Sequence, residues 1–213
     1  AWSAYLRGLG KQVTVAVPDA FPDFLRWQPD VEKIIRYDRH PEEIDKALKD
    51  AHLICCLDFN APERLDSMQE AFEKSTAKRV LFDHHLEPQL DAVVSVSRPE
   101  LSSTSEIVFR VLWQMGEFEK MDKKIASTIY SGMMCDTGGF TYNSSRPEIF
   151  FIICQLLTKG IDKDKIYRKV FNNYSQWAIR LRGYLMSQKL NYLEDYHASY
   201  YTLTRDDMRN FHY

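Results

Sequence analysis

Two short apolar segments, each followed or ended by an acidic residue, constrain the fold of this chain most strongly. Residues 52–57 and 79–82 are nearly continuous runs of apolar side chains, and Asp58 and Asp83 come directly after them. Short runs without alternation are typical of strands buried on both faces, as in a parallel sheet. Because ligands of open parallel sheets bind beyond the carboxyl ends of the strands, we expect both aspartates to face one crevice.

Strands and helices alternate in the first half of the chain, and helices follow. Strands are predicted at residues 12–17, 33–37, 52–57, 79–82 and 91–96, with helices at 21–27, 41–50 and 62–74. This alternation predicts an α/β fold with a doubly wound, mainly parallel sheet. A helical section is predicted at 102–115, 122–135, 147–159 and 163–171, and a long linking helix at 176–194. A strand at 198–203 and a helix at 205–211 predict the start of a second α/β domain.

Composition excludes some classes of function. The 213 residues carry a net charge of −2, which argues against a dedicated binder of long nucleic acid. The longest apolar stretch, residues 149–157, is too short to span a membrane. The four cysteines form no C-x-x-C pair, so we expect reduced, mostly buried thiols and a cytoplasmic location.

Three places in the sequence carry side chains that bind metals. They are Asp58, the tripeptide Asp83-His84-His85, and Asp136, which ends an apolar helix beside a Gly-Gly turn. Asp58, His84 and Asp136 are interpreted as ligands of one or two divalent cations, and their mixed donors favour manganese over iron or zinc. Taken alone, an aspartate after a strand is often a helix N-cap, and a His-His pair is more often structural. Three such places within one α/β domain favour the metal interpretation.

The ordered motifs resemble the DHH phosphoesterase family. The tripeptide Asp83-His84-His85 stands where the family has its name-giving motif, and Asp58 ends an earlier strand as it does there. The segment 136–140, Asp-Thr-Gly-Gly-Phe, is similar to a later family motif. Residues 102–106, Ser-Ser-Thr-Ser-Glu, resemble the family's small-polar helix start near the substrate. The resemblance covers about residues 12–197.

The resemblance implies a role for each matching residue. Asp58 would bridge two metal ions, and His84 and Asp136 would complete the coordination of one of them. His85 and Asp83 are the implied catalytic residues. His85 would lie close to the substrate phosphate or behind the metal ligands, and Asp83 would orient the imidazoles. The implied cofactor is a pair of Mn²⁺ ions, with Mg²⁺ as the alternative, and activated water is the nucleophile. Weaker substrate contacts are expected from Ser103, Thr104 and Asn143.

One family motif, of the type His-x-x-x-Asp-x-Asp, does not occur in this sequence. Residues 1–175 are therefore expected to be a catalytic domain without its N-terminal strand and first motif. Residues 176–194 are expected to be the linking helix, and 195–213 the beginning of a C-terminal substrate-binding domain. The full-length protein is expected to contain the missing motif, and this stretch alone to bind metal weakly, singly or not at all.

The function implied is hydrolysis of short oligonucleotides (nanoRNA, dinucleotides), of 3′-phosphoadenosine 5′-phosphate, or of both. A RecJ-type single-strand exonuclease and a manganese pyrophosphatase are the alternatives within the superfamily. A non-catalytic nucleotide-binding regulatory module is the alternative from another class. The expected partner is a small nucleotide or short oligonucleotide, not long nucleic acid or a membrane. Aromatic side chains expected to pack between domains or in a homodimer are Trp177, Tyr184 and Tyr192.

Overall fold

The computed structural model describes residues 1–212, which divide into two compact units. The first unit comprises Ala1–Val170, and the second begins at Phe171. All of the predicted site residues belong to the first unit. Among the described residues, no helix combines the length and the apolar character needed to cross a bilayer.

The first unit is built around parallel strands. Its strands are β1 (Val15–Val17), β2 (Ile34–Arg36), β3 (Leu53–Leu57), β4 (Lys78–Asp83) and β5 (Val94–Ser97). β3, β4 and β5 form a three-stranded parallel sheet in that order, and β1 pairs with β2 in parallel. The predicted α/β fold with parallel strands is confirmed.

The strand register brings two acidic residues to one edge of the sheet. Leu57 at the end of β3 lies opposite Phe82 on β4. The N–H of Asp58 donates to the carbonyl of Phe82 at 3.1 Å, which continues the ladder one residue beyond β3. Asp83 is the last residue of β4. Asp58 and Asp83 therefore leave the sheet side by side.

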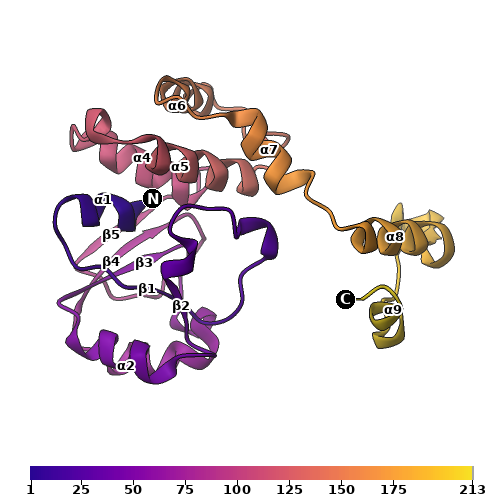
Figure 1. The fold of residues 1–213 in the computed structure, drawn as a ribbon, viewed down its shortest axis with the longest axis horizontal. Coiled ribbons are helices and arrows are strands. Elements are labelled where there is room, and N and C mark those ends of the chain that lie inside the picture. Colours follow the sequence, from indigo (N-terminus) through magenta and orange to yellow (C-terminus); the bar gives the residue numbers. More distant parts are fainter. Residues whose placement is uncertain (213) are drawn as a thin grey trace. The chain divides into compact units, whose positions relative to one another are not determined.

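Helices cover both faces of the parallel strands. Figure 1 shows α2 (Pro41–Asp50) on one side, and α1 (Trp2–Gly8), α4 (Thr104–Gln114) and α5 (Lys123–Asp136) on the other. Between β3 and β4 the chain forms a 3₁₀ segment, Pro62–Met68, and α3 (Gln69–Lys74). One buried cluster packs α2, the 3₁₀ segment and α3 against β3 and β4. It consists of Ile44, Cys56, Leu65, Met68, Phe72, Leu81 and Leu90.

The helical section follows the sheet as predicted. After α4 and α5 come α6 (Pro147–Thr158) and α7 (Lys163–Phe171). Ser103 caps α4 and Asp122 caps α5, each by accepting a backbone N–H, and α6 begins with a proline.

The helix predicted at residues 21–27 is wrong: only a 3₁₀ turn, Asp23–Leu25, forms there. Prolines at positions 22 and 29 limit the segment, since the residue before a proline avoids helical conformation.

Gly132 lies where α5 approaches α4 closely. A Cβ at this position would lie 1.9 Å from Ser105 Oγ and 2.7 Å from Ser105 Cβ, and the second atom cannot rotate away. Gly132→Ala is expected to lower the free energy of unfolding by about 1–3 kcal/mol, because overpacking outweighs the helix preference of alanine. Urea denaturation measures the change. Gly8→Ala, with nothing within 4 Å, is the control. A Gly132→Ala protein as stable as the control would contradict the close packing.

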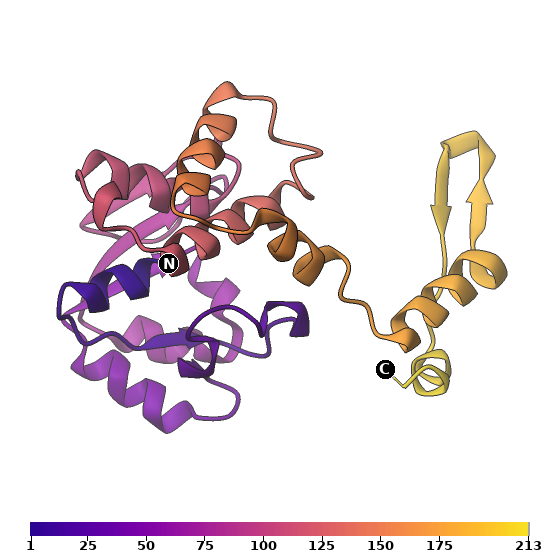
Figure 2. The same cartoon turned by 45° about the horizontal axis from the view of Figure 1, so that its top comes forward.

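The second unit begins with a helix and continues as a hairpin. Its elements are α8 (Gln176–Tyr184), a π-helical turn (Leu185–Lys189), β6 (Asn191–Leu193), β7 (Ala198–Tyr200) and α9 (Arg205–Asn210). β6 and β7 pair antiparallel (Figure 2). The long helix predicted at 176–194 is therefore wrong beyond Lys189, because residues 191–193 join the hairpin. The strand predicted at 198–203 is confirmed only for Ala198–Tyr200.

The cysteines carry no disulfide among the described residues. All four are free, as expected. Cys56 is buried, whereas Cys154 is exposed on α6, so the expectation of mostly buried thiols is wrong. The prediction fails because α6 turns only one of its apolar faces toward the core, namely Ile149, Ile152 and Leu156.

Candidate metal centre

Asp58 directly follows β3 and has a left-handed backbone conformation, with φ 70°. Outside glycine this conformation is uncommon, and aspartate is one of the few residues that adopt it. Its side chain is 53% exposed, and its Oδ1 accepts a 2.7 Å hydrogen bond from the Thr104 hydroxyl. The N-cap alternative for Asp58 is wrong, because the next helical segment begins at Pro62 after Ala61 and has no side-chain cap.

Asp83 is fully buried and fixes the ring of His85. Its Oδ1 lies 2.7 Å from His85 Nδ1, and its Oδ2 accepts the backbone N–H of His85 at 3.2 Å. Because the carboxylate occupies Nδ1, the lone pair of a neutral His85 is on Nε2. Histidine ligands of metals are commonly oriented by such a carboxylate.

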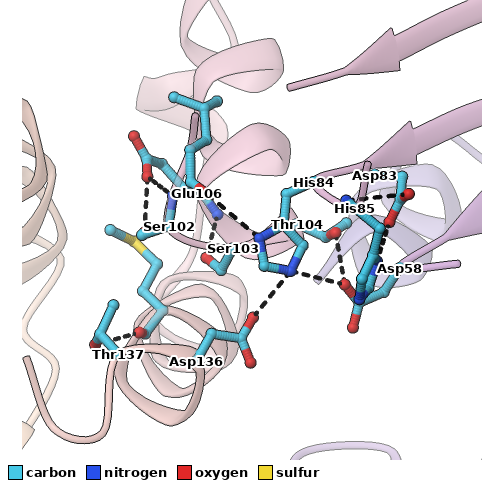
Figure 3. A network of polar contacts seen from close by, with 12 residues as sticks. Asp58, Asp83, His84, His85, Ser102, Ser103, Thr104, Glu106, Asp136 and Thr137 are labelled. Atoms are coloured by element: carbon cyan, nitrogen blue, oxygen red, sulfur yellow. Dashed lines mark hydrogen bonds and ion pairs between the residues drawn. The ribbon is translucent and has the colours of Figure 1, made fainter. Parts of the chain in front are cut away.

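His84 presents its second nitrogen to two carboxylates. Its Nδ1 lies 3.3 Å from the backbone carbonyl of Leu101, and a carbonyl only accepts, so Nδ1 carries the proton. Its Nε2 lies 3.6 Å from Asp58 Oδ1 and 4.0 Å from Asp136 Oδ2 (Figure 3). These separations are too long for hydrogen bonds. His84 Nε2 therefore lies near two carboxylate oxygens, one from the residue after β3 and one from the last residue of α5.

A tight turn ends α5 directly after Asp136. The hydroxyl of Thr137, which is fully buried, donates to the carbonyl of Met133 at 2.7 Å. Gly138 and Gly139 both have positive φ, 54° and 73°, and the N–H of Gly139 donates to the carbonyl of Met134 at 2.8 Å. The glycines thus provide the left-handed conformation that closes the helix. Asp136 is held in the final turn as a result.

The environment of Asp136 disfavours its negative charge. Burial, and then the neighbouring Asp58 carboxylate, raise the pKa of Asp136 to about 6, although His84 and His85 act in the opposite direction. The C-terminus of a helix is also the negative end of its dipole. A carboxylate in this position costs stability, and a bound cation would offset that cost.

The donors fit a divalent cation. One ligand atom from each of Asp58, His84 and His85 lies within 4.8 Å of the others. Asp136 lies next to this group, with its Oδ2 4.0 Å from His84 Nε2. Carboxylate oxygens mixed with imidazole nitrogens suit manganese, iron or zinc. The resemblance places His85 close to the substrate phosphate or behind the metal ligands, whereas the geometry places it among the candidate ligands.

The three predicted substrate contacts differ in their positions. Ser103 is fully buried, and its hydroxyl accepts the N–H of Glu106 at 3.0 Å to cap α4. Thr104 is nearly buried and donates to Asp58. Asn143 lies in an exposed turn with φ 47°, and within residues 1–212 no hydrogen bond joins it to the metal-type donors. Of the three, only Thr104 contacts a candidate ligand directly, and their substrate roles stay predictions.

The buried carboxylate of Glu106 holds the backbone segment that orients His84. Glu106 accepts from the Ser102 N–H at 2.9 Å, from the Ser102 hydroxyl at 2.7 Å, from Arg110 Nη2 at 2.8 Å and from Arg146 Nη2 at 2.9 Å. Burial alone would raise the pKa of Glu106, but the hydrogen bonds of Ser102 and Arg110 and the charge of Arg146 lower it below its usual value. Glu106 thereby holds the segment next to Leu101, whose carbonyl orients His84.

Only some of the contacts of Glu106 can be predicted from the sequence. A glutamate followed four positions later by an arginine in an apolar helix indicates the Glu106–Arg110 pair. Arg146 is 40 positions from Glu106, and no local pattern indicates their contact. The Leu101 carbonyl is a backbone group, so its role has no sequence signal at all.

This chain is similar to one family model and to a solved structure. A family model described as "DHH family, N-terminal domain" matches residues 1–133. The crystal structure of an exopolyphosphatase-related protein from Bacteroides fragilis superposes with a TM-score of 0.95. Its sequence is 48% identical, and the match covers 98% of this chain and 61% of that chain.

Two curated relatives are more distant. An uncharacterized protein of Mycoplasma pneumoniae is 27% identical over 128 residues, which are 60% of this chain and 38% of the relative. An uncharacterized protein of Mycoplasma genitalium is 26% identical over 119 residues, 56% of this chain and 35% of the relative. The chain thus spans less than two thirds of the length of each of these relatives.

Proposed function

The chain belongs to the DHH family, and from this membership we propose that the protein is a metal-dependent phosphoesterase. The proposed substrates are short oligonucleotides (nanoRNA, dinucleotides), 3′-phosphoadenosine 5′-phosphate, or both. The observation that carries the proposal is the position of His84 Nε2, 3.6 Å from Asp58 and 4.0 Å from Asp136. The net charge of −2 supports a small anionic substrate over long nucleic acid.

The residues of this chain have distinct parts in the proposed reaction. Asp58, His84 and Asp136, with His85, would hold Mn²⁺, two ions being expected and Mg²⁺ the alternative. A bound divalent cation supplies Lewis acidity, which polarises the phosphoryl group and lowers the pKa of water. Asp83 keeps the Nδ1 proton of His85 in place, so that Nε2 stays free to bind.

A second candidate follows from one comparison. The Bacteroides fragilis protein, 48% identical over 98% of this chain, is described as exopolyphosphatase-related. By that similarity the same residues would act on phosphoanhydride bonds at the end of a polyphosphate chain. Both substrates present a phosphorus centre flanked by anionic oxygens, and the donors of the site favour neither.

A substrate panel tests the proposal. The full-length protein is assayed with Mn²⁺ against a dinucleotide, 3′-phosphoadenosine 5′-phosphate, linear polyphosphate, pyrophosphate and long single-stranded DNA. We expect mononucleotide or phosphate release from the first two. Release of phosphate from polyphosphate alone would favour the second candidate. Hydrolysis of pyrophosphate alone, or of long DNA in preference, would contradict the proposed substrates, and nucleotide binding without turnover would indicate a regulatory module.

A further inference from the structure

A second cleft lies in the first unit, outside the candidate metal centre. Its volume is about 510 Å³, within the range of roughly 300–1,000 Å³ that is typical of small-molecule sites. The start of α5 contributes Lys123 and Lys124, and α7 contributes Lys165 and Lys169. The loop before β2 contributes Trp27.

The charges of this cleft are unbalanced. Its four lysines face two aspartates, Asp122 and Asp162. Each aspartate accepts a backbone N–H through its Oδ1, Asp122 from Ile125 at 2.8 Å and Asp162 from Lys165 at 2.9 Å. In the part of the chain that the structure describes, none of the four lysines forms an ion pair, whereas Lys163 beside them pairs with Asp164 at 2.6 Å. The ammonium groups are therefore available to an anion.

The tryptophan ring holds one of the lysines at the cleft. Trp27 Nε1 is buried and has no hydrogen-bond partner among residues 1–212. The Lys169 ammonium lies 4.8 Å from the centroid of the Trp27 ring, in cation–π contact. Because the Nε1 atom is buried, its N–H is not open to a ligand in the cleft, and Trp27 contributes through the face of its ring.

We propose that this cleft binds a chain of phosphate groups, such as the phosphates of inorganic polyphosphate or of a nucleoside triphosphate. Lysine ammonium groups bind phosphate through charge-assisted hydrogen bonds. α5 begins here and ends at Asp136, so its 14 residues separate the cleft from the metal centre by about 20 Å. The cleft is thus a separate site, whatever the substrate of the metal centre.

Calorimetric titration with tripolyphosphate tests this site without the catalytic one. With a chelator present, the metal centre has no cation and its carboxylates repel anions. We expect the wild-type protein to bind tripolyphosphate, and the double variant Lys165→Gln/Lys169→Gln to bind at least about tenfold more weakly. Lys163→Gln removes the same charge from the same helix outside the cleft, and it is expected to leave the affinity unchanged.

Further arms of the experiment identify the source of the phosphates. Equal affinity for ATP and tripolyphosphate would show that the phosphates alone are recognised, and tighter binding of ATP would show that the base is bound as well. Sulfate at equal ionic strength should not compete. Absence of tripolyphosphate binding to the wild-type protein would overturn the proposal, as would an equal loss of affinity in Lys163→Gln and in the double variant. Metal-free binding keeps this result independent of the phosphoesterase proposal.

Discussion

Asp136→Asn in the full-length enzyme is expected to lower turnover at least about 100-fold. Groups that only orient metal ligands typically cost 10–100-fold in metal affinity or activity, so a group at the metal position should cost at least as much. Asparagine has the same shape but no charge to balance a cation. The measurement is kcat with Mn²⁺ on the preferred substrate. Asp91→Asn is the control, since Asp91 is exposed and precedes β5. It therefore lies at the end of the sheet opposite to the strand ends that carry Asp58 and Asp83.

The fold should survive this substitution. The pKa of Asp136 is raised to about 6 by burial and by Asp58, above the ordinary value for aspartate of about 3.9. A raised pKa means that the carboxylate stabilises the metal-free fold only while it is protonated, and that this contribution is lost as the pH rises through 6. Neutral asparagine should therefore leave the melting temperature at pH 7 unchanged or slightly higher without metal. Normal turnover of Asp136→Asn would remove Asp136 from the metal site.

Glu106→Ala is expected to have the largest effect on stability, a loss of about 3 kcal/mol. Removing one partner of a buried ion pair typically costs about 3–5 kcal/mol, and the partly exposed guanidinium groups of Arg110 and Arg146 place this case at the lower end. The N–H of Ser102 also loses its acceptor. Urea denaturation at pH 7 measures the change. Glu70→Ala is the matched control, because Glu70 pairs with Lys74 at the same i,i+4 spacing on an exposed surface, where solvent screens the pair and its loss changes stability little.

The contribution of Glu106 should depend on pH. Its pKa is lowered in the folded state, so its stabilising effect is present above the unfolded pKa of about 4.3 and is lost as the pH falls through the folded value. The difference in stability between wild type and Glu106→Ala should therefore narrow at strongly acidic pH. Equal losses for Glu106→Ala and Glu70→Ala at pH 7 would contradict the buried network.

Much of the fold could be predicted from the sequence, because its signals are local. Continuous apolar runs indicate β3 and β4, and helical periodicity with capping residues indicates α4 and α5. Topology then carries the prediction further: parallel strands that end together bring Asp58 and Asp83 to one edge. The family motifs add Asp136, which lies at the end of α5 near His84.

The remaining features depend on contacts between distant residues. The helix predicted at 176–194 stops at Lys189 because a later segment pairs with residues 191–193, and periodicity alone does not indicate that partner. The Glu106–Arg146 contact joins the first turn of α4 to the residue that precedes α6. The place of His85 among the candidate ligands depends on a ring rotation set by Asp83, and a tripeptide motif does not specify ring orientation.

The most direct test is anomalous diffraction at the manganese edge from crystals of the full-length protein grown with Mn²⁺. We expect at least one anomalous peak in direct contact with a carboxylate oxygen of Asp58 and with Nε2 of His84, and with Asp136 bound to the same group. Peaks found only elsewhere in the molecule, with Asp58, His84 and Asp136 hydrogen-bonded to one another instead, would contradict the assignment of a metal centre.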